Sequence, residues 1–211
     1  MKGVIFDMDG TMFDSESIWQ DMWCHLPEQY GFAPNDRIGA DMCGATGEYA
    51  AEVIKKYYPK LDPAEFIQRG REEYKKRLLA KQPEEKTGLR EIVSHLKDKG
   101  YKLAVASGSE EIVIAKNMER AGMTDDFDAL VSDRNVPNGK PAPDIFLEAA
   151  RRLDLKPEEC YVIEDGEHGI IGAYRAGCVP IMVPDTIAPT EKIRELGIGI
   201  YESLLDVIEL I

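Results

Sequence analysis

Residues 4–11, with the sequence VIFDMDGT, hold the strongest structural signal in the chain. Three apolar residues run into an acid with no alternating polar residue, which is typical of a strand buried on both faces. Such strands belong to parallel sheets covered by helices, and ligands bind beyond the carboxyl ends of these strands. Asp7 and Asp9 stand at that end and Gly10 follows, so the stretch predicts a site for phosphoryl chemistry or a hard cation. A turn that merely ends a strand is the alternative when the stretch is considered alone.

The second part of the chain repeats a pattern of short apolar runs and amphipathic runs from Thr87 onward. Strands are predicted at residues 103–106, 127–131, 161–163, 179–183 and 198–200, and helices at 89–99, 110–120, 144–153, 167–176, 187–196 and 203–210. Strands that alternate with helices form βαβ units and a parallel sheet. The predicted fold class is therefore α/β, with a doubly wound, Rossmann-like core built from residues 1–14 and 84–211.

Residues 15–83 form a different kind of segment, with helical periodicity throughout and no convincing strand. Ser17 and Gln20 fit a capping box at the start of the first helix. Asp62 stands as an N-cap before Pro63, which suits the first turn of a long helix. We therefore predict an all-helical cap domain inserted directly after the first strand.

Composition narrows the function classes. With 211 residues, 44% hydrophobic and 31% charged, the chain resembles an ordinary globular protein that buries a sizeable core. Its net charge of −13 argues against nucleic-acid backbones and anionic membrane surfaces as partners. A small phosphorylated metabolite remains compatible with this charge, because a metal ion and one lysine can reverse the field locally.

The expected environment is the reducing cytoplasm. The four cysteines form no Cys-x-x-Cys pair, so free thiols are expected. The first apolar stretch ends at Asp7, which does not fit a signal peptide, and no run approaches the roughly eighteen apolar residues of a membrane span. We expect a cytoplasmic monomer that binds neither nucleic acid nor membrane.

Several polar residues fall at or just beyond the ends of predicted strands, namely Asp7, Ser107, Lys140, Glu164 and Asp165. Because the carboxyl ends of parallel strands share one edge of the sheet, these residues can converge there with Asp9. Two carboxylates about 4 Å apart repel each other by roughly 4 kcal/mol at an effective dielectric near 20. Four carboxylates beside one lysine therefore require a further cation, and oxygen ligands favour Mg²⁺.

Each of these residues also has a local interpretation. Lys140 fits an exposed turn, and Ser107 fits a capping box with Glu110. Glu164 and Asp165 fit the entry of a helix, where acids interact favourably with the helix dipole. Taken one at a time, these structural interpretations are the simpler ones.

Their order along the chain resembles the four motifs of the haloacid dehalogenase (HAD) superfamily. The stretches that carry the resemblance are residues 7–11 (DMDGT), 105–109 (VASGS), 139–144 (GKPAPD) and 162–166 (VIEDG). Together they span nearly the whole chain, and the likeness is strongest to the branch of beta-phosphoglucomutases, phosphonatases and small-molecule phosphatases. The resemblance implies a Rossmann-like core with a helical cap after the first strand.

The resemblance also implies catalytic roles. Asp7 would be the nucleophile that forms an aspartyl-phosphate, and Asp9 would protonate the leaving oxygen and later accept a proton from water. Phosphate-binding roles are implied for Ser107, Gly108 and Lys140.

For the metal, the resemblance implies a Mg²⁺ ion held by Asp7, by the backbone carbonyl of Asp9, and by Asp165. Glu164 would ligate the ion directly or through water. Gly166 stands where relatives often have serine, a departure that concerns hydrogen bonding around the metal rather than its ligands.

The member of the branch is indicated by two positions. Asp9 argues against dehalogenation, because a halide leaves without protonation. In the cap loop of residues 42–47, Gly47 occupies the position where phosphonatases carry a Schiff-base lysine and beta-phosphoglucomutases an arginine. The hypothesis is a Mg²⁺-dependent phosphatase of a small phosphorylated metabolite, for instance a sugar phosphate. The alternatives are a sugar-phosphate mutase of the beta-phosphoglucomutase type and, more remotely, a non-catalytic phosphate- or metal-binding module.

Overall fold

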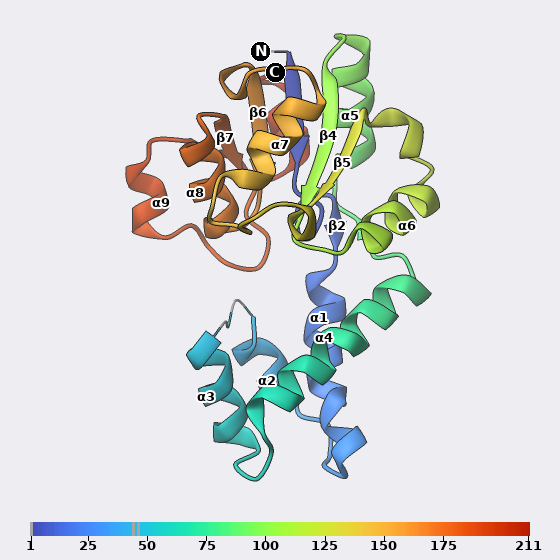
Figure 1. Cartoon of the computed structure of the whole chain (residues 1–211), viewed down its shortest axis with the longest axis vertical. Helices are drawn as coiled ribbons and strands as arrows, with labels where there is room; N and C mark the ends of the chain where they lie inside the picture. The colour runs from blue at the N-terminus through green and yellow to red at the C-terminus, as the bar shows by residue number, and fades with distance from the viewer. Residues whose placement is uncertain (1, 44, 46) are drawn as a thin grey trace. The chain divides into compact units, whose positions relative to one another are not determined.

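The chain forms two compact units in a computed structural model that describes residues 2–43, 45 and 47–211. The core unit comprises Met1–Asp14 and Glu84–Ile211, and the helical unit comprises Ser15–Pro83. Figure 1 shows the elements of both units along the chain.

A six-stranded parallel sheet forms the centre of the core unit, which confirms the predicted α/β class. In spatial order its strands are β5 (Ala129–Ser132), β4 (Lys102–Ser107), β1 (Gly3–Phe6), β6 (Cys160–Glu164), β7 (Val179–Met182) and β8 (Gly199–Ile200). The strand that precedes Asp7 is thus central, and its residues 4–6 are fully buried. All strands of this sheet end at the same edge, which we call the catalytic edge.

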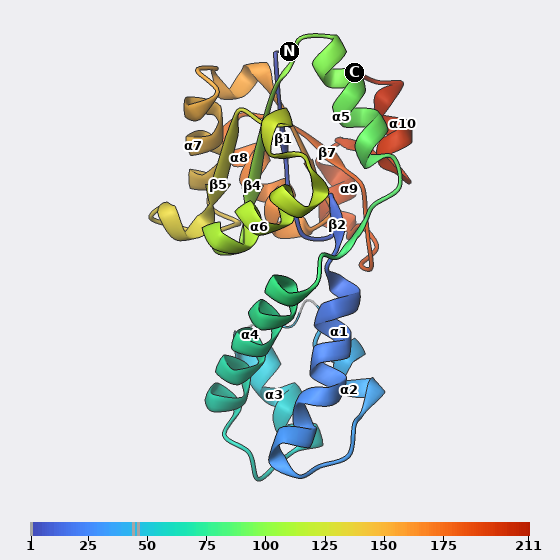
Figure 2. The same cartoon turned by 90° about the vertical axis from the view of Figure 1, so that its right-hand side faces the viewer.

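Helices cover both faces of the sheet. Figure 2 shows α7 (Asp144–Arg152) and α8 (Glu167–Ala176) on one side, and α5 (Leu89–Asp98) and α10 (Leu204–Ile208) on the other. Helix α6 (Glu111–Ala121) packs beside β5. Helix α9 (Glu191–Glu195) packs against β7 and α8. This two-sided covering is the reason that the strands carry continuous apolar runs.

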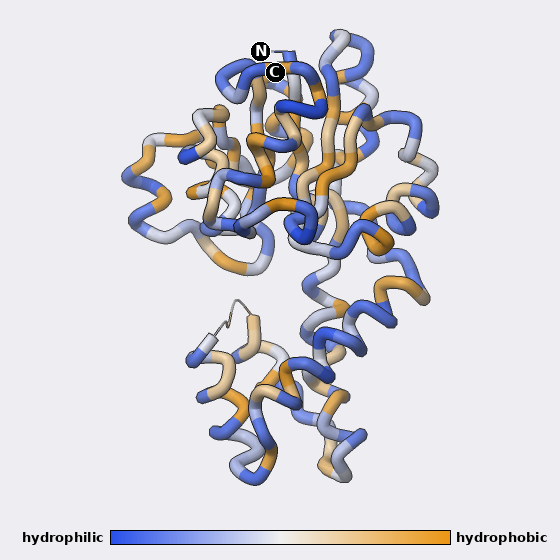
Figure 3. The backbone as a smooth tube through the Cα atoms, in the orientation of Figure 1, coloured by the Kyte–Doolittle hydropathy of each residue, from blue (hydrophilic) through white to orange (hydrophobic). Residues whose placement is uncertain are grey.

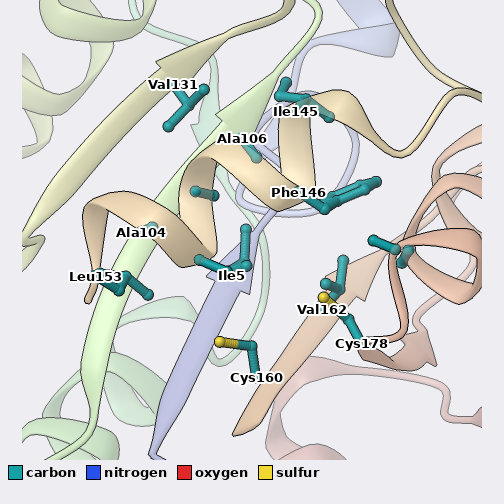
Figure 4. Close-up of a cluster of buried hydrophobic side chains, with 14 of the residues drawn as sticks. Ile5, Ala104, Ala106, Val131, Ile145, Phe146, Leu153, Cys160, Val162 and Cys178 are labelled. Carbon is teal, nitrogen blue, oxygen red and sulfur yellow. The ribbon is translucent and has the colours of Figure 1, made fainter. Parts of the chain in front are cut away.

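The main hydrophobic core lies between the sheet and α7 with α8. Figure 4 shows Ile5, Ala106 and Val162 of three neighbouring strands facing Ile145 and Phe146 of α7. Small alanine side chains on β4 let α7 approach the sheet closely, and the larger residues fill the remaining space between the sheet and the helices. In Figure 3 the central strands are coloured largely as hydrophobic, whereas the outer turns of the flanking helices are hydrophilic.

The helical unit contains α1 (Glu16–His25), α2 (Asp36–Asp41), α3 (Gly47–Tyr57) and α4 (Pro63–Ala80). Its core is rich in aromatic rings, among which Trp23 and Phe66 are fully buried with centroids 5.8 Å apart. Short 3-10 turns occur at Leu26–Tyr30 in this unit and at Thr124–Asp126, Asp133–Asn135 and Pro157–Glu159 in the core unit. None of the described helices is both long enough and apolar enough to cross a membrane.

Several predicted boundaries differ from the structure. The first helix begins at Glu16 rather than after Ser17, so the predicted capping box of Ser17 is wrong. At α4 the prediction is confirmed, because the Asp62 side chain accepts a hydrogen bond from the backbone N–H of Glu65 at 2.9 Å. The helix predicted at 187–196 is reduced to α9, because Thr190 caps its start through the N–H of Ile193.

Three short elements were missed by the sequence analysis. Helix α2 is too short to show a helical period. Strands β2 (Phe13–Asp14) and β3 (Glu84–Glu85) pair antiparallel, so the two chain segments that leave and re-enter the core unit lie side by side. A two-residue strand carries too little pattern to be predicted from composition.

Candidate active site

Asp7 lies at the end of the central strand and is 5% exposed. Its backbone N–H donates to the carbonyl of Ile163 at 2.9 Å, which continues the β1–β6 ladder by one residue. Beyond it the chain turns sharply at Gly10, whose φ is +87°. A Cβ at Gly10 would overlap the carboxylate of Asp165. The structure therefore brings Asp165 directly against the turn that carries Asp7.

Lys140 joins two of the carboxylates. Its ammonium group donates to the Asp7 carboxylate, to Glu164 Oε1 at 2.7 Å and to the backbone carbonyl of Ala106 at 3.1 Å. The lysine side chain is 12% exposed, so the predicted alternative of an exposed turn lysine is wrong. Three strand ends, those of β1, β4 and β6, thus meet at one cation.

Glu164 is fixed by the start of α8. Its Oε2 accepts a hydrogen bond from the backbone N–H of Gly166 at 2.8 Å, while Oε1 is taken by Lys140. A Cβ at Gly169 would overlap this carboxylate, so the first turn of α8 leaves space for it only because residue 169 is glycine. Both Glu164 oxygens therefore have partners within the chain.

Asp9 is turned toward the loop after β4. Its Oδ2 accepts hydrogen bonds from Ser107 Oγ at 2.9 Å and from Ser109 Oγ at 2.8 Å, and its buried Oδ1 has no hydrogen-bond partner among the described residues. The backbone N–H of Ser109 donates to Ser107 Oγ at 2.9 Å. Ser107 does not cap α6, which begins at Glu111, so the predicted capping box is wrong here too.

Two site neighbours were missed by the sequence analysis. Ser109 holds Asp9, and the signal for it was a second hydroxyl two residues beyond Ser107. Asp133 follows β5 at the same edge, and its Oδ2 lies close to the positions that a Cβ would take at Gly108 and Gly139, 3.6 and 2.9 Å away. An acid that directly follows a strand was the available signal.

The electrostatics of the cluster are dominated by crowded acids. Burial raises the pKa of Asp7 well above its usual range, Lys140 lowers it, and Glu164 adds a further rise. Burial, followed by the charge of Glu164, raises the pKa of Asp165 to about 8. Burial alone would lower the pKa of Lys140, but the two carboxylates that it contacts outweigh burial and raise it. One lysine does not neutralise these acids, and the excess negative charge favours a cation.

The donor atoms fit a hard cation such as Mg²⁺. Asp7 and the backbone carbonyl of Asp9 belong to the turn after β1, and the carboxylate of Asp165 lies against Gly10 of that turn. All are oxygen donors, which suit Mg²⁺ rather than zinc. Within the ranges that the structure describes, no three His, Cys, Asp or Glu side chains are already grouped as a metal site. Lys140 and the serine hydroxyls instead hold Glu164 and Asp9.

The structure describes only part of the predicted cap loop, residues 42–47. Gly44 and Thr46 lie outside the described residues, and Gly47 is the first residue of α3, with a φ of +56°. The role that the resemblance implies for this loop therefore stays a prediction.

Comparisons with known proteins agree with the motifs. The sequence model of the haloacid dehalogenase-like hydrolases matches residues 4–183. The chain is 30% identical over 177 residues to the phosphorylated carbohydrates phosphatase of Thermotoga maritima, covering 84% of this chain and 82% of that protein. It is 32% identical over 190 residues to the beta-phosphoglucomutase of Bacillus subtilis, covering 87% of this chain and 83% of that protein. The crystal structure of a putative beta-phosphoglucomutase from Thermotoga maritima superimposes with a TM-score of 0.81 and 28% identity, covering both chains completely.

Proposed function

The chain belongs to the haloacid dehalogenase-like hydrolase family, and from that premise we propose that it is a Mg²⁺-dependent phosphatase with Asp7 as nucleophile. The observation that carries this proposal is the contact of Lys140 with both Asp7 and Glu164. Lys140 is 133 residues from Asp7 in sequence, yet its ammonium lies at the end of the central strand. A cation beside a buried carboxylate at this edge suits attack on an anionic phosphoryl group.

The first step is attack of an Asp7 carboxylate oxygen on phosphorus, in line with the leaving oxygen. Lys140 lies against Asp7, so its ammonium can stabilise the negative charge of the phosphoryl oxygens during the attack. The backbone N–H groups of Met8 and Asp9 add donors, whereas the N–H of Gly10 donates to the carbonyl of Phe13 at 2.9 Å. The products of this step are an aspartyl-phosphate and an alkoxide that needs a proton.

Asp9 supplies that proton and afterwards accepts one from the water that hydrolyses the aspartyl-phosphate. The hydroxyls of Ser107 and Ser109 hold its carboxylate, and this arrangement orients the acid before substrate enters. Proton transfer of this kind contributes typically ~10²–10⁴-fold to the rate. Ser107 and Gly108 are proposed to bind the phosphate as well, which requires the Ser107 hydroxyl to turn from Asp9.

Asp7, Asp165 and the backbone carbonyl of Asp9 would hold Mg²⁺, with Glu164 joining directly or through water. When bound, the ion neutralises the phosphoryl oxygens and offsets the crowding of the carboxylates. The pKa of Asp165, which burial and the charge of Glu164 raise, would be lowered by the positive charge of a bound cation.

The substrate class is a small phosphorylated metabolite, and a sugar phosphate is the first candidate because the relative from Thermotoga maritima is named for phosphorylated carbohydrates. The test is a panel of sugar phosphates, nucleotides and phosphoglycolate incubated with the full chain and Mg²⁺, with released inorganic phosphate measured by colour reaction. Release from at least one sugar phosphate at a kcat/KM above about 10⁴ M⁻¹s⁻¹ is expected. No release from any member would refute the phosphatase.

A mutase is the second candidate, because the relative from Bacillus subtilis is a beta-phosphoglucomutase. The glycine at position 47 favours hydrolysis, since it cannot contact a distal phosphate as an arginine does. A mutase would convert a sugar 1-phosphate to the 6-phosphate, require a bisphosphate for turnover and release phosphate only slowly. Phosphorus-31 NMR of the same reactions distinguishes a phosphatase, which releases inorganic phosphate, from a mutase, which forms the sugar 6-phosphate.

A further inference from the structure

An ion pair next to the catalytic edge is not used by the proposed chemistry. Lys86 Nζ donates to Asp185 Oδ1 at 2.6 Å, and the two side chains are 27% and 17% exposed. The second oxygen of Asp185, Oδ2, is buried and has no hydrogen-bond partner in the described part of the chain. A half-satisfied, largely buried carboxylate is costly unless its environment uses the remaining oxygen.

Asp185 lies in the loop that follows β7, at the same edge as the catalytic acids. Met182 of β7 pairs in register with Glu164, and the backbone N–H of Val183 donates to the Glu164 carbonyl at 2.8 Å. Asp165 is the next residue after Glu164.

Lys86 lies in the segment that re-enters the core unit, beside the segment that carries Asp7. It follows β3, and its backbone N–H donates to the carbonyl of Met12 at 2.9 Å. The N–H of Met12 in turn donates to the carbonyl of Met8 at 3.0 Å. The ion pair therefore links the turn after β1 to the loop after β7, and Asp165 directly follows β6, the strand between them.

We propose that the Lys86–Asp185 pair sets the negative charge that a Mg²⁺ ion meets at the catalytic edge. Asp185 acts from outside the ligand set, through its free oxygen and a water of the ion's shell, and Lys86 offsets part of its charge. Lys86 and Asp185 are positioning residues, because they act through Asp165 and the hydration of the ion. This inference rests on the proposed Mg²⁺ requirement.

The proposal makes opposite predictions for the two partners. Lys86→Met leaves Asp185 uncompensated beside Asp165, so the dissociation constant of Mg²⁺ should fall. Asp185→Asn leaves the lysine charge uncompensated, so the constant should rise. Residues that support a metal site from outside its ligands typically change metal affinity by about 10–100-fold, and a shift near tenfold is expected in each direction. The double variant should return to within about threefold of the unchanged protein.

Isothermal titration of the full chain with MgCl₂ measures these constants without any need for substrate. Lys86→Arg, which keeps the charge, should stay within about twofold of the unchanged protein. The matched control is the Lys2–Glu159 pair, 2.8 Å apart at the amino ends of β1 and β6. Lys2→Met and Glu159→Gln make the same changes in net charge and should leave the constant unchanged. Circular dichroism verifies that every variant is folded.

The possible outcomes of the titrations distinguish the proposal from a purely structural ion pair. Opposite shifts for Lys86→Met and Asp185→Asn support the proposal, and shifts in the same direction, or none beyond twofold, overturn it in favour of a purely structural ion pair. A variant that fails to fold is replaced by Lys86→Gln or Asp185→Ser, for which the same signs are required. If the unchanged protein binds no Mg²⁺, the proposed metal requirement fails and this inference fails with it.

Discussion

A single ammonium group organises the acids of the catalytic edge. Lys140 donates to two carboxylates and one backbone carbonyl, and its amine lies 5.3 Å from the ring centroid of the buried Phe146. Burial of a charge is tolerated here because the carboxylates of Asp7 and Glu164 compensate it. The contact with Lys140 lowers the pKa of Asp7, whereas burial, the larger effect, raises it.

The first prediction concerns Asp7, the proposed nucleophile. Asp7→Asn keeps the size of the side chain and removes the oxygen that attacks phosphorus, so kcat on an aryl phosphate should fall by roughly 10⁴-fold or more. The melting temperature should change by only a few degrees, because the amide still accepts from Lys140. Steady-state assays and a thermal melt measure both quantities. Retention of more than a tenth of the activity would remove Asp7 as the nucleophile.

Helix α8 makes room for a site residue because one position in its first turn has no side chain. Gly169 lies in its first turn, and the Glu164 carboxylate occupies the space where a side chain would start. The N–H of Gly166 and the ammonium of Lys140 then hold the carboxylate in that space. The helix thus positions an acid by means of a glycine and a backbone donor.

The second prediction follows from this packing. Gly169→Ala should improve helix propensity by about 1 kcal/mol, but it also separates the buried Glu164 from Lys140 and leaves the lysine charge less compensated, so the melting temperature should fall. The new Cβ would displace the flexible end of Glu164 and take it from Lys140, so kcat should fall by about tenfold or more. A thermal melt and phosphate-release kinetics separate the two effects. An active Gly169→Ala variant would mean that the position of Glu164 does not matter.

The third prediction concerns helix α7 and pH. Hydrogen bonds from Arg151 and then from Arg152 lower the pKa of Glu148 to about 2, from a usual value of 4.5. Because the folded pKa is depressed, these pairs stabilise the protein fully above about pH 4.5, and their contribution is lost as the pH falls toward 2. The arginines are partly exposed, so the contribution at pH 7 should be about 0.5–1 kcal/mol.

Urea unfolding of the unchanged protein and of Glu148→Gln tests this sign. The variant should be less stable at pH 7, and the difference should shrink between pH 5 and pH 3. Arg152 also donates to the Leu130 carbonyl of β5 at 2.8 Å, and this contact should survive in the variant. A difference that grows as the pH falls would contradict the assignment.

At the scale of the whole molecule, charge favours metal binding. The chain carries 39 acidic and 26 basic residues, and several of the acids crowd at one edge of the core unit. A bound divalent cation reduces the repulsion among them, whereas a polyanionic partner would increase it. The proposed phosphatase activity therefore depends on a bound divalent cation.

The fourth prediction is that EDTA abolishes phosphate release and that added Mg²⁺ restores it. Mg²⁺ should also raise the melting temperature, because binding to the folded state at 100 times the dissociation constant contributes about 2.7 kcal/mol. A calorimetric scan with and without Mg²⁺ gives this second readout independently of activity. Indifference to both EDTA and Mg²⁺ would overturn the metal assignment.

The amino-acid sequence by itself determined the alternation of strands and helices, the burial of the first strand and the helical nature of residues 15–83. These features arise from periodicity and from turn residues, which act over a few positions. It also identified Asp7, Lys140 and Glu164, but only their shared order with a known family outweighed the simpler local interpretations.

Only the tertiary structure decided how these residues meet. The contact of Lys140 with Asp7 and Glu164, the turn of Asp9 toward Ser109 and the Lys86–Asp185 pair depend on which strands are neighbours. That order is set by packing of the whole sheet, with β1 between β4 and β6. Local patterns carry no information about it, because through-space contacts join residues that are far apart in the chain.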